Sequence, residues 1–311
     1  MNKTCVIIAG PTASGKTNVA IELAKQFNTE IISADSRQCY KELNIGVAKP
    51  TDEQLQAVLH HFINSHSITE NLSAADFEKY ALGNVNKIFK KNDVAIMAGG
   101  TGLYIKAFCE GMDEIPGIEP DIRNAIVTDY NNNGIQWLQQ QVKSEDADYF
   151  IKGEMQNPQR MIRALEVKRS TGMSIISFQN KNKKIRNFNI LKIGLELPRE
   201  VLYERINIRV DEMMQMGLAE EAKGMEPYKH LNALNTVGYK ELFDFFDLHF
   251  TQQEARETGL KKTIDNIKQN TRHYAKRQMT WFKKDKEIIW CEASHNPSDV
   301  SGKIIELINK L

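Results

Sequence analysis

Gly10-Pro11-Thr12-Ala13-Ser14-Gly15-Lys16-Thr17 is the stretch that decides the fold of this 311-residue chain. It matches the pattern G-x-x-x-x-G-K-[ST] and stands between an apolar run at 4–9 and a helical pattern at 16–27. In loops of this kind the backbone N–H groups converge on an anion, and the following helix adds the positive end of its dipole. Lys16 is placed to neutralise phosphate oxygens, and Thr17 is placed to hold Mg²⁺. The stretch predicts a nucleotide-binding type of phosphate loop, typical of ATP-binding proteins, without predicting ATP hydrolysis.

Strands alternate with helices on both sides of this loop. We expect strands at 4–9, 30–33, 93–98, 190–197 and 288–291. We expect helices at 16–27, at 73–91 with Ser73 as N-cap, from about 102, at 199–215, 238–245 and 253–282, and at the C-terminal end. Strands that alternate with helices are typical of a parallel sheet with helices packed on it. The sequence therefore predicts an α/β fold with a phosphate-loop core.

The pattern changes between residue 111 and about residue 184. Pro116 and Pro120 mark a linker, and short helical patterns with few strand signals follow it at 121–130, 135–142, 146–151 and 158–170. We therefore expect a core formed by 1–112 and 186–311, with a basic C-terminal helix, and a small helical insertion domain at 113–185.

The composition is that of a soluble globular protein. The chain carries 41 Lys and Arg against 40 Asp and Glu, with 41% hydrophobic and 26% charged residues. This balance excludes a disordered chain and argues against a wholly basic nucleic-acid binder. No apolar run is long enough to cross a bilayer, and no signal-peptide pattern opens the chain. The four cysteines are scattered without metal-binding or disulfide spacing, so we expect a reduced cytoplasmic protein.

Positive charge is concentrated near the C-terminal end. Residues 261–286 hold nine basic and two acidic residues, an excess of 9 − 2 = +7. On a helix, one stripe groups the cations Lys261, Lys268, Arg272, Lys276 and Lys283. Tyr274 and Trp281 fall on the other arc, where we expect them to pack in the core. Such a stripe is either a solvated face or a surface for a phosphate backbone.

Asp35 is the acid that follows an apolar run in this core. Many kinases and hydrolases of this class place a metal-binding acid after a second buried strand, but the strand at 93–98 runs into Gly99 and Gly100 instead. Taken alone, Asp35 is a metal-binding acid, a substrate-binding acid, a general base or the cap of a turn.

Several ordered segments carry a family resemblance. They are the loop 10–17, Ser33-Ala34-Asp35-Ser36, Gly46-Val47-Ala48-Lys49-Pro50, Gly99-Gly100-Thr101-Gly102, Asn157-Pro158-Gln159-Arg160, Val237-Gly238-Tyr239-Lys240 and Ala275-Lys276-Arg277-Gln278. With these segments the chain resembles the tRNA dimethylallyltransferases of bacterial type over nearly its whole length. The resemblance implies transfer of a dimethylallyl group from its diphosphate to N6 of the adenosine 3′ of a tRNA anticodon. Where some members carry Arg two residues before the Val-Gly-Tyr segment, this chain has Asn235.

The resemblance also implies roles for individual residues. Asp35 is the general base, Thr101 lies at the reaction centre, and Lys16 with the loop 10–17 holds the diphosphate together with Mg²⁺ near Thr17. The expected tRNA-binding residues are Asp35, Ser36, Arg37, Gln38, Thr101, Arg123, Gln159, Arg160, Met161, Ile162, Arg163, Arg272, Lys276 and Arg277. The expected partners are dimethylallyl diphosphate and the tRNA anticodon stem-loop, and the enzyme is expected to be a monomer without membrane contact.

Three alternatives stay open. A relative that prenylates free adenine nucleotides would share the loop, Asp35 and Thr101 but would not need the basic helix. A small-molecule kinase would use Asp35 to bind the acceptor hydroxyl, with Arg160 and Arg163 as a lid. An RNA-binding module would use the loop only to grip a phosphate.

Overall fold

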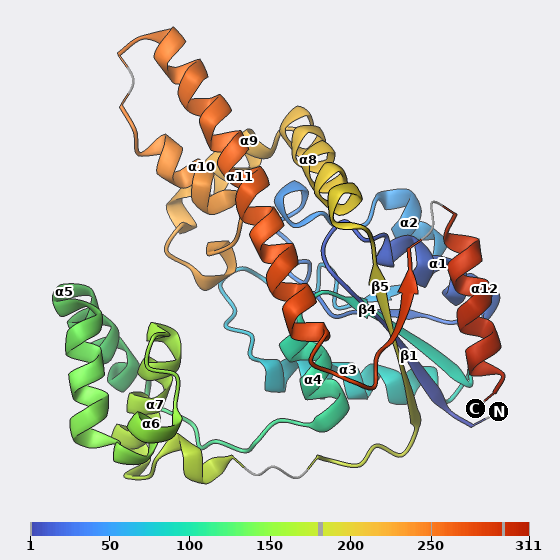
Figure 1. Cartoon of the computed structure of the whole chain (residues 1–311), viewed down its shortest axis with the longest axis horizontal. Helices are drawn as coiled ribbons and strands as arrows, with labels where there is room; N and C mark the ends of the chain where they lie inside the picture. The colour runs from blue at the N-terminus through green and yellow to red at the C-terminus, as the bar shows by residue number, and fades with distance from the viewer. Residues whose placement is uncertain (1, 180–182, 250, 294–295, 311) are drawn as a thin grey trace. The chain divides into compact units, whose positions relative to one another are not determined.

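The computed structural model describes residues 2–179, 183–249, 251–293 and 296–310 (Figure 1). The chain divides into two compact units. One unit is formed by Met1–Glu110 and Ile185–Leu311, and the other by Gly111–Lys184.

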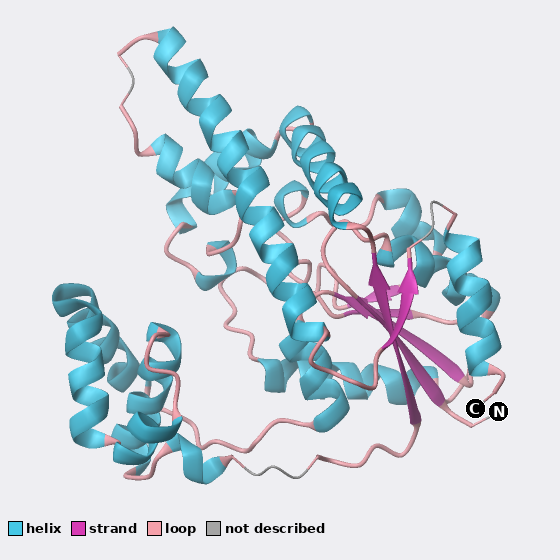
Figure 2. Cartoon of the chain, viewed as in Figure 1, coloured by secondary structure: helices cyan, strands magenta, loops and turns pink. Residues whose placement is uncertain are grey.

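The first unit is built on a parallel sheet of six strands in the order β3-β2-β4-β1-β5-β6 (Figure 2). The strands are β1 Thr4–Ala9, β2 Ile31–Ser33, β3 His60–His61, β4 Val94–Gly99, β5 Asn189–Glu196 and β6 Ile289–Glu292. Every residue of the central strand β1 is buried, as expected for a parallel strand that is covered on both faces. The order places β1 between β4 and β5, so the loop that follows β1 lies at the middle of the sheet edge.

Helices flank this sheet. In the described part of the first unit they are α1 Lys16–Gln26, α2 Asp52–Ala57, α3 Ala74–Ile88, α4 Gly102–Glu110, α8 Arg199–Gln215, α9 Leu218–Met225, α10 Tyr239–Phe246, α11 Gln253–Phe282 and α12 Pro297–Ile308. Leu23 of α1 and Ile304 of α12 share an apolar cluster with strand residues such as Ile8. The rings of Phe77 in α3 and Tyr104 in α4 stack at 4.4 Å. Buried apolar contacts therefore fix the strand ends relative to the helices.

The second unit is helical. It contains α5 Pro120–Glu145, α6 Ala147–Lys152 and α7 Pro158–Thr171. Gly134 interrupts α5 with a φ of 75° and a ψ of −172°, which separates the two helices expected at 121–130 and 135–142. Ile126, Leu138, Tyr149 and Ile162 are among the buried residues of its core. This unit therefore has an apolar core of its own.

Within the part of the chain that the structure describes, no helix combines the length and the apolar character that a bilayer span requires. All four cysteines are free, and the buried thiols of Cys39 and Cys109 have pKa values raised to about 12, chiefly by burial.

Candidate functional site

Three neighbouring strands deliver the predicted catalytic residues to one edge of the sheet. The phosphate loop follows β1, Asp35 follows β2 and Thr101 follows β4, and these strands are adjacent in the order β2-β4-β1. In parallel sheets, ligands bind at the carboxyl ends of the strands because those ends lie side by side. The topology therefore brings together residues that lie up to 91 positions apart in the sequence (101 − 10 = 91).

The phosphate loop turns around a polar interior. The hydroxyl of Ser14 is fully buried, and within the described structure it has no hydrogen-bond partner. The Nζ atom of Lys16 donates to the carbonyl oxygen of Pro11 at 2.6 Å, so this side chain folds back over the loop. Helix α1 begins at Lys16 and presents its N-terminal N–H groups to the same place. An orphaned hydroxyl, an ammonium group and a helix start are the components of an anion site.

A second cation, Arg209 of α8, lies beside the loop. Its Nη1 atom is 3.4 Å from the hydroxyl oxygen of Thr12. Burial and the nearby guanidinium of Arg209 lower the pKa of Lys16 to about 7, although Asp35 acts in the opposite direction. Burial also lowers the pKa of Arg209, and two cations in a buried place favour the binding of an anion with more than one negative charge. Sequence reasoning missed Arg209, because nothing in the local pattern of α8 connects it with a loop about 190 residues earlier.

Asp35 both caps a turn and keeps one oxygen available. Its Oδ1 atom accepts hydrogen bonds from the backbone N–H groups of Arg37 at 2.8 Å and Gln38 at 3.3 Å. In the described residues, its Oδ2 atom accepts no hydrogen bond. The two hydrogen bonds to Oδ1 fix the orientation of the Asp35 carboxylate. Its Oδ2 atom is therefore held in place to accept a hydrogen bond from another donor.

Thr101 is joined directly to the segment that carries Asp35. Its hydroxyl oxygen accepts a hydrogen bond from the backbone N–H of Ser36 at 3.0 Å, and its own N–H donates to the carbonyl oxygen of Ala34 at 3.1 Å. Gly99 makes this close approach possible, because a Cβ atom there would lie 2.2 Å from the carbonyl oxygen of Ala34. The two predicted catalytic residues thus belong to one hydrogen-bonded turn pair.

Gln278 of α11 joins the phosphate loop to the turn after β4. Its Oε1 atom accepts from the N–H of Thr12 at 2.8 Å, and its Nε2 atom donates to the carbonyl oxygen of Gly100 at 2.9 Å. The side chain of Gln278 is buried, so its bond to Gly100 is shielded from water, whereas the bond to Thr12 is partly buried. Tyr274, one turn earlier, is near Asp35, and burial together with that carboxylate raises the pKa of Tyr274 to about 12. Helix α11 therefore helps to build the site, and the sequence motif Lys276-Arg277-Gln278 was its only signal.

The segment that carries Gln38 is anchored by a carboxylate. Glu221 of α9 accepts hydrogen bonds from the backbone N–H groups of Ile45 at 2.8 Å and Gly46 at 2.9 Å, and from the hydroxyl of the buried Tyr239. The Nε2 atom of Gln38 donates to the carbonyl oxygen of Ala48 at 2.9 Å. Through Glu221, these bonds connect the segment that contains Gly46 with Tyr239 of the Val-Gly-Tyr segment.

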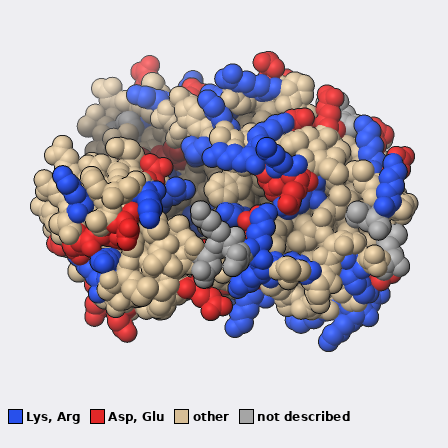
Figure 3. All heavy atoms as spheres, turned by 60° about the horizontal axis from the view of Figure 1, so that its bottom comes forward, with Lys and Arg blue, Asp and Glu red and all other residues tan. Residues whose placement is uncertain are grey.

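The cations of α11 and of its C-cap residue Lys283 differ in their partners. Lys268 pairs with Asp211 at 2.7 Å, Lys283 pairs with Glu196 at 2.6 Å, and Arg272 donates to Asn207 at 2.7 Å. Lys276 and Arg277 are exposed and have no carboxylate within ion-pair distance in the described residues. The predicted stripe of cations is therefore partly neutralised by neighbouring side chains. Figure 3 shows Lys and Arg interspersed with Asp and Glu on one face of the molecule.

A shallow hollow of about 270 Å³ adjoins the unpaired cations of α11. It is lined by Lys276, Arg277, Thr280, Trp281 and Lys284. Trp281 is 39% exposed, so the expectation that it packs in the core is wrong. One edge of the indole packs against Gly102, where a Cβ atom would lie 2.2 Å from the ring, and the rest of the side chain is exposed.

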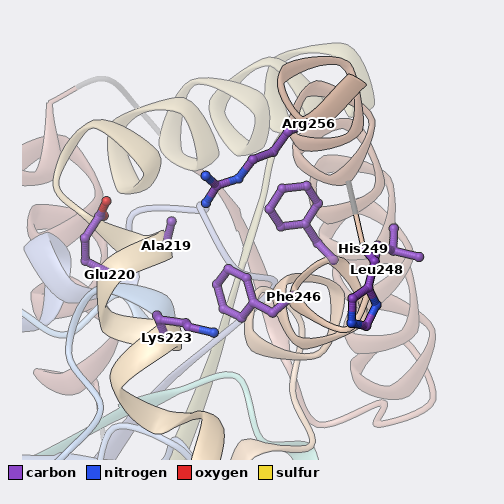
Figure 4. Close-up of a pocket in the computed structure, with 8 residues that line it drawn as sticks. Ala219, Glu220, Lys223, Phe246, Leu248, His249 and Arg256 are labelled. Atoms are coloured by element: carbon purple, nitrogen blue, oxygen red, sulfur yellow. The ribbon is translucent and has the colours of Figure 1, made fainter. Parts of the chain in front are cut away.

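A larger hollow of about 520 Å³ lies away from these residues, between α9, α10 and the start of α11 (Figure 4). Arg256 extends across it toward Ala219, and the ring of Phe246 lies below them in this view. It contains none of the residues that the sequence predicts for the site.

The second unit holds its own group of predicted residues. Arg123 of α5 and Arg163 of α7 both donate to Glu166, and Arg123 also reaches Gln159 at 3.5 Å. Arg160 is exposed, 3.9 Å from Glu154. The predicted tRNA-binding residues Met161 and Ile162 are 0% and 1% exposed and belong to the core of this unit, so their side chains support α7 from within.

The described residues contain no group of three or more His, Cys, Asp or Glu that could hold a metal ion. A Mg²⁺ ion of the kind predicted at Thr17 takes its ligands mainly from water, substrate phosphate and one hydroxyl, and it does not require such a group. The hydroxyl of Thr17, directly after Lys16 in the phosphate loop, fits that description.

The chain is similar to known proteins over almost its full length. A family model described as IPP transferase matches residues 38–285. The chain is 48% identical over 309 residues to the tRNA dimethylallyltransferase of Christiangramia forsetii, covering 99% of this chain and 100% of that protein. It is also 48% identical over 310 residues to the tRNA dimethylallyltransferase of Flavobacterium psychrophilum, with 98% and 97% covered.

Solved structures agree with these sequence relatives. The full-length tRNA isopentenylpyrophosphate transferase of Bacillus halodurans is 33% identical and superposes with a TM-score of 0.70, covering 99% of this chain and 97% of that one. A eukaryotic dimethylallyltransferase acting on tRNA is 24% identical, with a TM-score of 0.76 over 94% of this chain and 74% of that one, and shares the fold.

Proposed function

Because the chain belongs to the IPP transferase family, we propose that it transfers a dimethylallyl group from dimethylallyl diphosphate to N6 of the adenosine 3′ of the anticodon in tRNA. The observation that carries this proposal is the edge of the sheet where the phosphate loop, Asp35 and Thr101 meet beside Lys16 and Arg209. That edge offers an anion site and a carboxylate oxygen within one group of hydrogen-bonded turns. The reaction needs both.

The chemistry assigns a task to each of these groups. The bond between the allylic carbon and the diphosphate oxygen breaks, and the N6 amine forms the new carbon–nitrogen bond. Negative charge grows on the leaving diphosphate, where Lys16, Arg209 and the loop N–H groups stabilise it. The N6 proton passes to the Oδ2 atom of Asp35, which Arg37 and Gln38 hold in place through Oδ1. Thr101 keeps this turn against the reaction centre through Ser36.

A Mg²⁺ ion bound near Thr17 would add positive charge on the leaving diphosphate. The adenine must leave the anticodon loop to reach the site, which costs roughly a few kcal/mol of stacking and pairing energy. The exposed Lys276 and Arg277 on α11 and the arginines of the second unit are the groups that we assign to the tRNA. We further propose that the enzyme acts in the cytoplasm, where its tRNA substrate is, and as a monomer.

One assay separates this proposal from the alternatives. The protein is incubated with dimethylallyl diphosphate and either unmodified tRNA or AMP, and separately with ATP and small-molecule acceptors. We expect prenylation of tRNA alone, detected as the N6-modified adenosine after digestion. Transfer to AMP instead would favour the free-nucleotide enzyme, phosphoryl transfer from ATP would favour the kinase, and tRNA binding without any transfer would leave an RNA-binding module.

The first variant tests the close approach at the sheet edge. Gly99→Ala places a Cβ atom 2.2 Å from the carbonyl oxygen of Ala34, so the backbone before Asp35 must shift. We expect kcat to fall about 10²-fold, because catalytic groups displaced by about 1 Å lose that much. Gly83→Ala in α3 is the matched control, since a Cβ atom added there would meet nothing within 4 Å. Equal kcat values for the two variants would contradict the proposed geometry.

The second variant tests the unpaired cations of α11. If Lys276 and Arg277 contact tRNA phosphates, each contact releases counterions on binding. Replacing both with Gln is expected to weaken tRNA binding and to reduce the slope of log Kd against log salt by about 1.4, or about 0.7 for each contact with single-stranded RNA. The measurement is filter binding or fluorescence anisotropy between low and moderate salt.

The matched control replaces Lys268 and Lys283 with Gln. This change removes the same charge from α11 and its C-cap residue, but these two lysines already pair with Asp211 and Glu196. We expect a much smaller change of slope. If both double variants change the slope equally, net charge and not a specific contact governs binding by α11.

A further inference from the structure

A buried carboxylate lies beneath the arginines of the helical unit. Glu166 of α7 is 1% exposed. Its Oε2 atom accepts from the Nη1 atom of Arg123 at 2.7 Å, and its Oε1 atom accepts from the Nη1 atom of Arg163 at 2.5 Å. Arg123 comes from α5 and Arg163 from α7, so one side chain joins the two helices of this unit.

The arginines are covered only on one side. Their side chains are 46% and 40% exposed, whereas that of Glu166 is 2% exposed. Each guanidinium has five N–H donors, and Glu166 takes one from each. Gln159 accepts a further bond from the Nη2 atom of Arg123 at 3.5 Å. Most donors of both arginines therefore remain available to a ligand in solution.

The surrounding core makes Glu166 a fixed point. Ile162 and Leu165 of α7 and Ile126 of α5 are at most 1% exposed and pack in the same cluster. Without Glu166, the guanidiniums of Arg123 and Arg163 would repel each other and sample many rotamers. A carboxylate between them cancels the repulsion and selects one arrangement, which is the preparation that bidentate phosphate recognition requires.

We propose that Glu166 is a positioning residue that holds Arg123 and Arg163 as a pre-ordered pair for the phosphate backbone of tRNA. The inference rests on the proposed function, since it names how that substrate is recognised. In this proposal the buried Glu166 strengthens the binding of tRNA, a polyanion. The negative charge of Glu166 alone would weaken that binding.

The charge effect and the positioning effect of Glu166 change tRNA binding in opposite directions, so one substitution distinguishes them. Glu166→Gln keeps the size of the side chain and removes one negative charge from the unit. If charge alone matters, tRNA binding becomes tighter. If position matters, the Kd for tRNA rises about tenfold, the scale of one lost charge-assisted hydrogen bond. In steady-state assays we expect KM for tRNA to rise and kcat at saturating tRNA to stay unchanged, because Glu166 does not touch the reacting atoms.

The matched control is Glu145→Gln. It also removes one acid of this unit and breaks a two-bond ion pair, that of Glu145 with Arg169 at 2.6 and 2.9 Å. We expect it to leave the Kd for tRNA unchanged or slightly lower. In a background with Arg123→Gln and Arg163→Gln, Glu166→Gln should cause no further loss, because no arginine remains to be positioned.

Two results would overturn the inference. They are tighter or unchanged tRNA binding by a folded Glu166→Gln variant, and a loss that persists in the background without the arginines. Thermal melting followed by circular dichroism establishes folding. If Glu166→Gln unfolds the unit, Glu166→Asp takes its place, because it keeps the charge and withdraws the carboxylate by one methylene, so only the positioning account expects weaker binding. Binding is measured apart from transfer, so a wild-type protein that binds tRNA without prenylating it would count against the proposed function alone.

Discussion

Lys16→Ala is expected to lower the rate of dimethylallyl transfer about 10³-fold, the upper range for removing one preorganised charge stabiliser. Lys16 lies in the phosphate loop with Arg209 nearby, and the proposed mechanism uses its charge to stabilise the leaving diphosphate. Dimethylallyl diphosphate should bind more weakly as well. Binding of tRNA should stay largely intact, because the cations assigned to tRNA lie outside the phosphate loop.

The measurement pairs single-turnover transfer with separate binding of each substrate. Lys25→Ala is the matched control, because Lys25 is an exposed lysine on the same helix, α1. It should leave rate and affinities unchanged. An equal loss of diphosphate and tRNA affinity in Lys16→Ala would show that the loop is structural or that it grips the tRNA.

The lowered pKa of Lys16 adds a pH dependence with a definite sign. In the free protein this pKa is about 7, so Lys16 is charged below that pH and increasingly neutral above it. A bound diphosphate favours the charged form, so binding takes up a proton when the pH exceeds about 7. Diphosphate affinity should therefore fall as the pH rises through this value in the wild type. That part of the dependence should vanish in Lys16→Ala, whereas the titration of the diphosphate itself remains in both.

Much of the fold could be predicted because local patterns and the observed structure agree. The predicted α/β phosphate-loop fold is confirmed. The strand at 4–9 and the helices at 199–215 and 253–282 have the expected bounds, since a continuous apolar run and long amphipathic patterns are strong local signals. Ser73 caps α3 through the N–H of Asp76, as its position before an apolar pattern indicated. The short strand β3 was missed because two residues show no alternation, and the helix α9 was missed as well.

The candidate site was less accessible to sequence reasoning because its parts are joined over long distances. Nothing local to Arg209 points to Thr12, and nothing local to Gln278 shows that it bridges Thr12 and Gly100. For the stripe of cations on α11, the sequence instead suggested more unpaired charge than the structure shows. Periodicity grouped its cations correctly on one face, but it could not show that Lys268 and Lys283 are paired with acids from other elements. The sequence gives the number of charged residues, whereas the number of unpaired charges at the surface depends on which ion-pair partners the fold brings near them.

Asp35→Asn is expected to lower the single-turnover rate of transfer by about 10²–10⁴-fold, the range for losing a positioned general base. The amide cannot accept the N6 proton. It still offers a carbonyl oxygen to the N–H groups of Arg37 and Gln38, so the turn and the fold should be preserved. Both substrates should bind with near-native affinity. The variant therefore removes one role of this side chain and keeps the other.

Asp35→Ala completes the test, because it removes the cap together with the base. If Asp35 acts as the base, the two variants should lose transfer to a similar extent, with the alanine variant also less stable toward heat. If Asp35 only caps the turn, Asp35→Asn should transfer at a near-native rate and only Asp35→Ala should fail. The two oxygens of this carboxylate make that separation possible, since Oδ1 accepts hydrogen bonds from the backbone of its own turn and the proposed mechanism uses Oδ2.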